Sequence, residues 1–342
     1  MRARNNKIDI LRIIAAFSVI FIHCESFVLH SPAAALARFA VPVFFMISGY
    51  FFFDRINPSK FKKRIKHYCI ILLCSFAVYS LLFMTTDLLN ITNIYKSIAD
   101  NFSVNTIINL VVFNDPPFAE YLWFLLALIY CEITAYISAK FGFTKILYFL
   151  IVPLILADIV FGKYSPLLFN LNIDAVFFRN WIFCGLPYFF LGALIKNQQD
   201  KDALKISKAA LYFSIVLFSF TLLFENYLCM NNPISNERGM FLSCPFLTIS
   251  IFLWAVAPIS DRANNSYPVK TLASMGRKYS LYIYLFHLII IFFFSAILIK
   301  FPQFKTLYSF ISPFLVFIIM LLISMIYVKI KNAVISKYIN QK

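Results

Sequence analysis

The sequence is poor in glycine and charge, and its cysteines and histidines show no recurring spacing. It contains only 7 glycines among 342 residues, which argues against a glycine-rich phosphate-binding loop. Its 7 cysteines are scattered without a Cys-x-x-Cys pair, and its 4 histidines lack the spacing of a zinc site. Charged residues amount to 13% of the chain, against about a quarter in soluble domains. The low charge argues against a soluble fold, and the spacing of the cysteines and histidines argues against a disulfide scaffold and a bound metal ion.

The sequence is instead rich in apolar residues. They make up 61% of the sequence, and 42 phenylalanines and 19 tyrosines suit lipid-facing and interfacial surfaces. Apolar stretches approach the length of roughly 20 residues that a helix needs to cross a bilayer. The predicted spans are residues 8–29, 37–53, 68–89, 118–138, 144–161, 181–196, 208–229, 240–257, 279–299 and 307–328. We therefore predict an all-α polytopic integral membrane bundle of about ten transmembrane helices.

Basic residues orient this bundle. With the N-terminus in the cytoplasm, about three quarters of the lysines and arginines fall in inner segments, as the positive-inside rule expects. The topology is then N-in and C-in, and the formal charge of +16 reflects orientation rather than nucleic-acid binding. The first span is too long for a cleavable signal peptide. We expect a single transmembrane domain over residues 1–342, with no separate soluble domain and no nucleic-acid partner.

Two outer segments carry further expectations. Residues 90–117 contain short apolar runs and are predicted to form a re-entrant or surface helix. Cys229 and Cys244 flank another outer loop and could pair in an oxidising compartment, although separate buried thiols are the simpler expectation. The sequence shows no internal repeat and no matched pair of broken helices, which weakens a transporter interpretation.

The first span carries the most informative pair of ionisable residues. Arg12 and His23 are eleven residues apart, which on a helix is three turns plus about 20° and a rise of about 16 Å. They therefore share one face, with Arg12 near the cytoplasmic end and His23 beyond the midplane. Histidine exchanges protons near neutral pH, so this face could deprotonate a hydroxyl inside the membrane. The simpler alternative pairs Arg12 with Asp9 and leaves His23 as a buried structural residue.

The second span ends in small residues and is followed by a dense basic loop. Ser48 and Gly49 would let a ligand or another backbone approach closely, although ordinary small-residue helix packing also explains them. The loop contains Lys62, Lys63 and Arg64. It is either a docking site for a phosphate-rich ligand or, more simply, a determinant of topology and lipid-headgroup contact.

Other polar and aromatic positions are less informative. Trp123 suits an aromatic belt at the outer interface. Arg179 precedes Trp181 on the outer side, where it could bind a sugar or remain solvated. His287 is a second intramembrane histidine and is either structural or catalytic. Glu132 lies in the inner half of the fourth span, where a nearby lysine could pair with it.

Four passages follow one another in an order that is typical of one family. Residues 8–12 (IDILR), with His23 eleven positions after the arginine, form an Arg-x10-His signature. Residues 38–50 (RFAVPVFFMISGY) match a second-helix motif, and residues 122–124 (LWF) and 280–287 (SLYIYLFH) match weaker later motifs. In these passages the chain resembles the membrane-bound acyltransferase family 3, whose multi-span members O-acylate bacterial surface glycans.

The resemblance implies a donor on the cytoplasmic side. That donor is an acyl-CoA, most often acetyl-CoA, used as a substrate, so no tightly bound cofactor and no metal are expected. Cationic side chains would contact its phosphates. The implied donor-binding residues are Arg12, Ser48, Gly49, Lys62, Lys63 and Arg64.

The resemblance also implies an acceptor on the outer side, a hydroxyl of a surface polysaccharide or lipid-linked oligosaccharide. The implied acceptor-binding residues are Arg38, Trp123, Arg179 and His287. His23 would act as general base or carry the acyl group transiently, with Arg12 as the second catalytic residue. The implied location is the bacterial cytoplasmic (inner) membrane, with the chain crossing the lipid bilayer many times.

The chain departs from the family pattern at two places. Tyr121 stands where relatives often have histidine, and the basic loop has only Arg64 where many members carry two spaced arginines. The match is to the short form, to which the enterobacterial common antigen O-acetyltransferases belong, so no extra esterase-like domain is expected. Two alternatives remain: a glycan or small-solute transporter with Arg12 and His23 lining the path, and a non-catalytic component of a polysaccharide-assembly complex.

Overall fold

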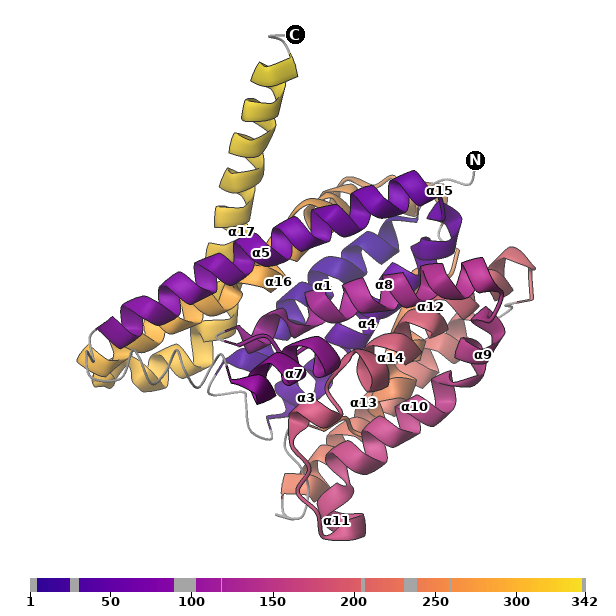
Figure 1. Ribbon diagram of the computed structural model, residues 1–342, viewed down its shortest axis with the longest axis horizontal. Helices are drawn as coiled ribbons and strands as arrows, with labels where there is room; N and C mark the ends of the chain where they lie inside the picture. Colours follow the sequence, from indigo (N-terminus) through magenta and orange to yellow (C-terminus); the bar gives the residue numbers. More distant parts are fainter. Residues whose placement is uncertain are drawn as a thin grey trace. The chain divides into compact units, whose positions relative to one another are not determined.

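The computed structural model describes residues 5–24, 31–88, 103–117, 119–203, 207–230, 239–258 and 260–339 (Figure 1). Within these ranges every regular element is a helix, and none is a strand. The predicted all-α class is therefore confirmed for the described part of the chain. Two basic residues of the predicted outer segments, Lys96 and Arg238, lie outside these ranges.

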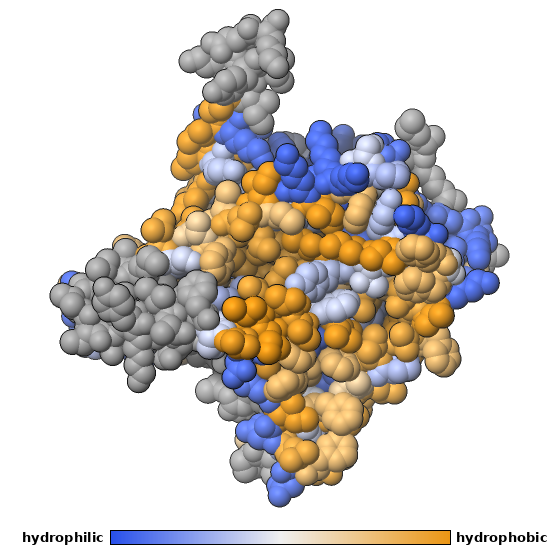
Figure 2. Space-filling view, viewed as in Figure 1, coloured by the Kyte–Doolittle hydropathy of each residue, from blue (hydrophilic) through white to orange (hydrophobic). Residues whose placement is uncertain are grey.

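Six helices of the described chain are long and apolar enough to cross a membrane. These candidates are Pro32–Phe52, Pro58–Leu82, Trp123–Phe141, Lys208–Met230, Tyr267–Lys300 and Pro302–Val334. Large apolar side chains lie exposed on them, for example Leu73 at 67% and Phe213 at 69%. Apolar residues cover much of the described surface that Figure 2 shows. Exposed apolar surface on this scale fits a multi-pass membrane protein, in which lipid covers these helices.

The chain divides into two compact units, each built from separate stretches of sequence. The first comprises Met1–Ala40, Lys208–Tyr227 and Phe246–Lys342, and the second comprises Val41–Ser207 and Leu228–Pro245. The helices that belong wholly or mostly to the first unit are α1 (Asn6–His23), α3 (Pro32–Ala37), α13 (Lys208–Met230), α14 (Cys244–Val256), α15 (Asp261–Asn264), α16 (Tyr267–Lys300) and α17 (Lys305–Ile339).

The second unit contains the remaining helices. They are α4 (Ala40–Phe52), α5 (Pro58–Leu88), α7 (Val104–Phe113), α8 (Trp123–Phe141), α9 (Thr144–Phe149), α10 (Ile151–Ala157), α11 (Ser165–Phe169) and α12 (Leu186–Asp200). Short 3-10 or π-helical segments join several of them, including Asp158–Lys163 before α11 and Trp181–Gly185 before α12.

In the first unit, α1 packs along α16 and also contacts α3 and α17. Aromatic rings line the contact with α17: the ring centroid of Phe17 lies 4.8 Å from that of Phe317 and 5.6 Å from that of Phe314. α1 begins at a cap in which the Asn5 side chain accepts a hydrogen bond from the backbone of Lys7. It ends at His23, whereas the sequence predicted a span to residue 29, and residues 25–30 lie outside the described part.

Two glycines set the packing of α4 against α12 in the second unit. A Cβ on Gly49 would lie 1.8 Å from the Phe189 backbone oxygen, and a Cβ on Gly192 would lie 2.0 Å from that of Met46. No side chain fits at either position, so the two backbones touch directly. The contact is reciprocal, because each helix supplies one glycine to the backbone of the other.

The predicted basic loop is instead the start of a helix. α5 begins at Pro58, and the Asn57 side chain accepts hydrogen bonds from the backbone N–H groups of Ser59 and Lys60. An asparagine cap followed by proline is a strong signal for a helix start. Lys62, Lys63 and Arg64 therefore lie in the first turns of α5, and the expectation of a loop was wrong.

Two other predicted segments can be compared with the helices that the structure shows. The span at 144–161 is divided at Leu150 into α9 and α10. Within the predicted surface segment 90–117, residues 104–113 form helix α7, which has no buried residue. Its position in the membrane stays a prediction. Cys229 and Cys244 are both buried and are not joined by a disulfide, which agrees with the simpler expectation.

Candidate functional site

Arg12 lies in an ion-paired cluster that joins two helices of the first unit. Its Nη1 donates to Oδ1 of Asp9, one turn earlier on α1, at 3.0 Å. The other carboxylate oxygen, Oδ2, accepts from Nη1 of Arg277 on α16 at 2.9 Å. Asp9 is buried, whereas the side chains of Arg12 and Arg277 are 26% and 31% exposed. One buried carboxylate thus holds two guanidinium groups, and the cluster has a net positive charge.

Close backbone contact explains why α16 meets α1 at this point. A Cβ on Gly276 would lie 1.8 Å from the backbone oxygen of Asp9. Beside it, Oδ1 of Asn6 accepts a further bond from Arg277 Nη1 at 3.2 Å. The Asn6 backbone N–H donates to Asn264 Oδ1, and its Nδ2 donates to the Asn264 carbonyl. These bonds fix the position of α1 along its axis and its rotation relative to α15 and α16.

His23 meets a second histidine farther along the same two helices. It is the last residue of α1 and is partly buried. Its ring centroid lies 5.2 Å from that of His287 on α16, with the ring planes inclined at 45°. His287 is 1% exposed, and its Nδ1 lies 2.8 Å from the Tyr284 carbonyl oxygen and 3.2 Å from that of Ile283. The fold therefore brings together two histidines that are distant in the sequence.

The cationic cluster and the histidine pair occupy successive positions on one helix pair. α1 and α16 run in the same direction, because Asp9 meets Arg277 early in both helices and His23 meets His287 later. Arg12 precedes His23 by eleven residues and Arg277 precedes His287 by ten, so each pair spans about 15–16 Å along its helix. This helix pair can hold an anion at one end and move a proton at the other.

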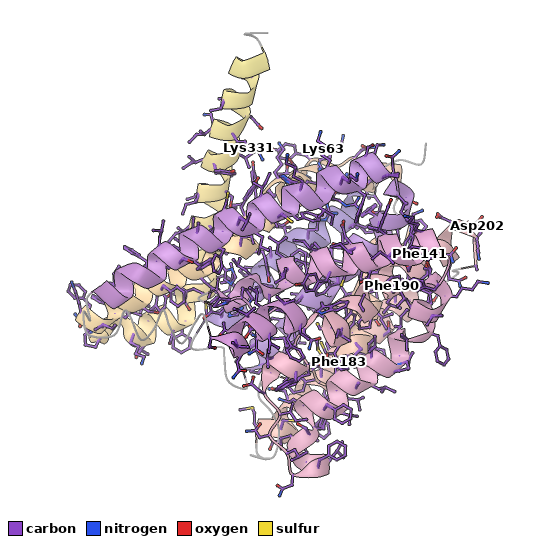
Figure 3. The ribbon with its side chains drawn as sticks, viewed as in Figure 1. Lys63, Phe141, Phe183, Phe190, Asp202 and Lys331 are labelled. Carbon is purple, nitrogen blue, oxygen red and sulfur yellow. The ribbon has the colours of Figure 1, made fainter. Side chains whose placement is uncertain are left out.

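In the second unit, one residue of the predicted basic group is held by an acid. Arg64 Nε donates to Glu132 Oε2 at 2.6 Å, and its guanidinium lies 5.0 Å from the Phe52 ring centroid. Its Nη2 has no hydrogen-bond partner among the described residues. Lys62 and Lys63 are exposed on the same helix, where Figure 3 labels Lys63. Glu132 thus pairs with an arginine rather than the expected lysine, because the helical start of α5 turns these lysines outward.

Ser48 and Gly49 have packing contacts in this unit. The Ser48 hydroxyl donates to the Phe44 carbonyl of its own helix at 2.8 Å, and Gly49 receives the backbone of α12. Both observations match small-residue helix packing, the simpler of the two sequence interpretations. Their predicted contact with the donor stays a prediction.

A cavity of about 410 Å³ lies beside Gly49 in the second unit. Asp54, Lys196 and Asp200 are among its lining residues, and the Lys196 ammonium forms ion pairs with both carboxylates. Two acids and one base leave these three side chains with a net negative charge. The cavity is therefore a poor match for the phosphates of a nucleotide donor.

The predicted acceptor-binding residues fall in both units. Trp123 and Arg179 are together in the second unit, where the guanidinium lies 5.7 Å from the Trp123 ring centroid. Arg38, at the C-terminal end of α3, and His287 belong to the first unit. Trp123 is only 7% exposed, so this contact is part of the packed interior rather than an exposed aromatic belt, and acceptor binding by these two residues stays a prediction. The structure thus joins two of these four residues and places His287 beside His23.

Comparison with known proteins identifies the family of this chain. The family model of acyltransferase family 3, described as an acyltransferase domain, matches residues 5–329. The chain belongs to acyltransferase family 3. The match spans almost the whole chain, as the resemblance predicted, and includes both ends of the α1–α16 pair. Membership in this family supports an acyltransferase.

One curated protein that is similar to this chain is named as a racemase rather than as an acyltransferase. A serine/alanine racemase from Enterococcus gallinarum is 28% identical over 303 residues, which cover 83% of this chain and 40% of the racemase. The chain therefore matches less than half the length of that protein. No solved structure matches the chain.

Three residues in contacts that the structure shows were not expected from the sequence. Arg277 was counted only among the inner basic residues, although the dipeptide Gly276-Arg277 marks a close helix contact beside a cation. Lys163 was counted as an outer residue, yet it is 1% exposed and its ammonium lies 4.3 Å from the Phe241 ring centroid. Asn114 was not singled out, and its side chain bonds the backbones of Trp123 and Trp181.

Proposed function

We propose that the chain is a membrane O-acyltransferase that moves an acyl group from acyl-CoA to a hydroxyl of a surface polysaccharide or lipid-linked oligosaccharide. Acetyl is the proposed group, and His23 is the proposed general base or acyl carrier. The observation that carries this proposal is the α1–α16 pair, with two arginines at one end and two histidines at the other. The transporter alternative receives no support from the family membership.

The arginine end suits the phosphates of the donor. Arg12 and Arg277 are held by Asp9 and remain partly exposed, so a net positive charge faces an incoming anion. The arm that joins the diphosphate of coenzyme A to its sulfur has roughly the chain length of five residues and spans roughly 16–18 Å when extended. That length agrees with the rise of about 16 Å from Arg12 to His23. We propose that the phosphates bind at Arg12 and Arg277 and that the thioester reaches His23.

The histidine end suits the transfer itself. The acceptor hydroxyl oxygen forms a bond to the thioester carbonyl carbon, and the carbon–sulfur bond breaks. His23 takes the hydroxyl proton and returns it to the departing thiolate, so that an ester and a free thiol result. In the relay form of this reaction, a ring nitrogen of His23 first accepts the acyl group and the hydroxyl then attacks it. Both forms are proposals that the same residues support.

The remaining assignments extend this proposal to the whole chain. We propose about ten spans in an N-in, C-in topology in a bacterial inner membrane, which admits the cytoplasmic donor and the outer acceptor from opposite sides. Lys62, Lys63 and Arg64, with Ser48 and Gly49, are proposed for the donor. Arg38, Trp123 and Arg179 are proposed for the acceptor.

The decisive experiment compares surface glycans from cells that make the wild-type protein, His23→Ala or His67→Ala. His67 is an exposed histidine on α5 and serves as the matched control. Mass spectrometry should show that wild-type and His67→Ala cells carry an added acyl group that His23→Ala cells lack. An inserted His23→Ala protein that still yields acylated glycan would refute the assignment of His23.

Donor binding is tested with Arg12→Ala in membrane vesicles supplied with labelled acetyl-CoA. Charge-assisted hydrogen bonds are worth about 1.5–3 kcal/mol, so the KM for acetyl-CoA should rise about tenfold or more while the KM for acceptor changes little. Arg262→Ala, an exposed arginine on α15, should leave both constants unchanged. Equal effects of Arg12→Ala on donor and acceptor would contradict the donor role.

A further inference from the structure

His287 is a buried histidine whose ring is fixed by its own helix. It is 1% exposed. Its Nδ1 lies 2.8 Å from the carbonyl oxygen of Tyr284 and 3.2 Å from that of Ile283. Both of these oxygens can only accept a hydrogen bond, so Nδ1 must carry the hydrogen. The backbone of α16 therefore selects one tautomer of the neutral ring.

The other nitrogen of His287 is left as an acceptor. With the hydrogen on Nδ1, the neutral ring has a lone pair on Nε2. Nε2 is buried and has no hydrogen-bond partner within the described ranges of the chain. A buried acceptor without a partner costs free energy. Turning the ring over would give up the Nδ1 contacts, so α16 holds this acceptor in place.

The position of His23 suits a bond to this acceptor. The two ring centroids are 5.2 Å apart, and the rings are inclined rather than stacked. Each imidazole nitrogen lies roughly 1 Å from its ring centre, so two facing nitrogens can come within the roughly 3 Å of a hydrogen bond. His23 is partly buried at the end of α1, and in the proposed arrangement its ring would turn to direct an N–H at Nε2.

We propose that His287 is a positioning residue that accepts a hydrogen bond from His23 through Nε2 and so sets the tautomer of His23. This inference rests on the proposed function, in which His23 takes a proton from the acceptor hydroxyl. With one N–H of His23 directed at His287, the other nitrogen presents its lone pair to the substrate. His287 then has the orienting role of the carboxylate in a Ser-His-Asp triad, without adding a negative charge inside the membrane.

The proton balance of the reaction leaves His287 unchanged. The hydroxyl proton moves to His23, the oxygen bonds the acyl carbon, the carbon–sulfur bond breaks, and the thiolate takes the proton from His23. Throughout these steps His287 keeps its Nδ1 hydrogen and accepts the His23 N–H, a bond that strengthens while His23 is cationic. His287 thus acts through His23 and does not contact the acceptor.

Two substitutions separate this role from a structural one. His287→Asn places an amide N–H where Nδ1 was, so it retains the bond to the Tyr284 carbonyl and loses the Nε2 acceptor. His287→Gln places an amide oxygen near the position of Nε2, so it retains the acceptor and loses the helix contact. A purely structural His287 would tolerate asparagine better than glutamine, whereas a positioning His287 requires the reverse order of activities.

The experiment measures transfer of labelled acetyl from acetyl-CoA in native membranes that contain the acceptor, using wild-type, His23→Ala, His287→Asn and His287→Gln proteins. Loss of one buried hydrogen bond is worth about 1–3 kcal/mol, so we expect His287→Asn to lower kcat roughly 10- to 100-fold with an unchanged KM for acetyl-CoA. His287→Gln should recover most of that loss. Thermal unfolding in detergent checks that each variant is folded.

Each outcome of this experiment either supports or overturns the positioning role of His287. It is overturned if folded His287→Asn keeps wild-type kcat, if only its KM changes, or if His287→Gln is as inactive as His287→Asn. If His287→Asn does not fold, an active His287→Gln supports the proposal and an inactive one overturns it. Failure of the proposed function is distinguishable, because the wild-type protein would then transfer no acetyl or His23→Ala would transfer it normally.

Discussion

The Asp9 carboxylate shows how a single residue links two helices. Its two oxygens bind Arg12 and Arg277 separately, at 3.0 and 2.9 Å. A buried carboxylate is costly unless it is fully bonded, and here each oxygen faces a cation. The same residue also keeps the two guanidinium groups together despite their repulsion. Asp9 is therefore as important to the cationic end of the site as the arginines themselves.

Asp9→Asn should destabilise the protein. An asparagine can accept from one arginine, but its amide hydrogens then face the other, so about 1–3 kcal/mol of stability is lost. Thermal unfolding of the detergent-solubilised protein measures the loss. The control is Asp54→Asn, because the Asp54 side chain is 47% exposed and its ion pair with Lys196 contributes at most about 1 kcal/mol. Equal stability of the two variants would contradict the bridging role of Asp9.

At the scale of elements, glycines determine how closely helices approach. Gly49 and Gly192 let α4 and α12 meet backbone to backbone, and Gly276 does the same for α16 against α1. Gly142 is different, because it ends α8 with a φ of +80° and a Cβ there would meet nothing within 4 Å. The first group serves packing, and Gly142 serves the left-handed cap.

Gly49→Ala and Gly142→Ala should therefore differ. The new methyl group at position 49 must push α12 away, which costs about 1–3 kcal/mol or more as overpacking. At position 142 only the left-handed conformation is strained, which costs about 1 kcal/mol. Thermal unfolding of both variants in the same detergent compares them. A Gly49→Ala protein that is no less stable than Gly142→Ala would show that the helices are not in contact there.

At the scale of the whole molecule, the membrane acts as the solvent for much of the described surface. Helices α5, α13, α16 and α17 expose large apolar side chains along their length. Such side chains are stable only where lipid or another protein covers them. The carboxylates of Asp9 and Glu132 are correspondingly buried within their units, where each is paired with arginine.

The proposed topology predicts the side from which two new cysteines react. In a protein with Cys69 and Cys74 replaced by alanine, Lys63→Cys should react with a membrane-impermeant maleimide only from the cytoplasmic side. Leu171→Cys, which replaces a residue that is 56% exposed, should react only from the outer side. The other five cysteines are buried and provide a low background. Labelling of both positions from one side would contradict the N-in arrangement.

Much of the candidate site was predictable because it depends on local periodicity. The eleven-residue spacing places Arg12 and His23 on one face of a helix wherever that helix packs. The pair of Asp9 with Arg12 follows equally from a spacing of three residues. The basic run after the second span was visible too, but its helical start depended on the Asn57 cap, a signal that outweighs the loop character of a charged segment.

The sequence by itself determined the all-helical membrane character, the apolar helices and the shared face of Arg12 and His23, because each of these follows from residues close together in the chain. Only the tertiary structure decided that Arg277 completes the Asp9 cluster, that His287 meets His23 and that Arg64 pairs with Glu132. These contacts join residues far apart in sequence. They depend on which helix faces pack together, and packing is a property of the assembled fold that no local spacing specifies.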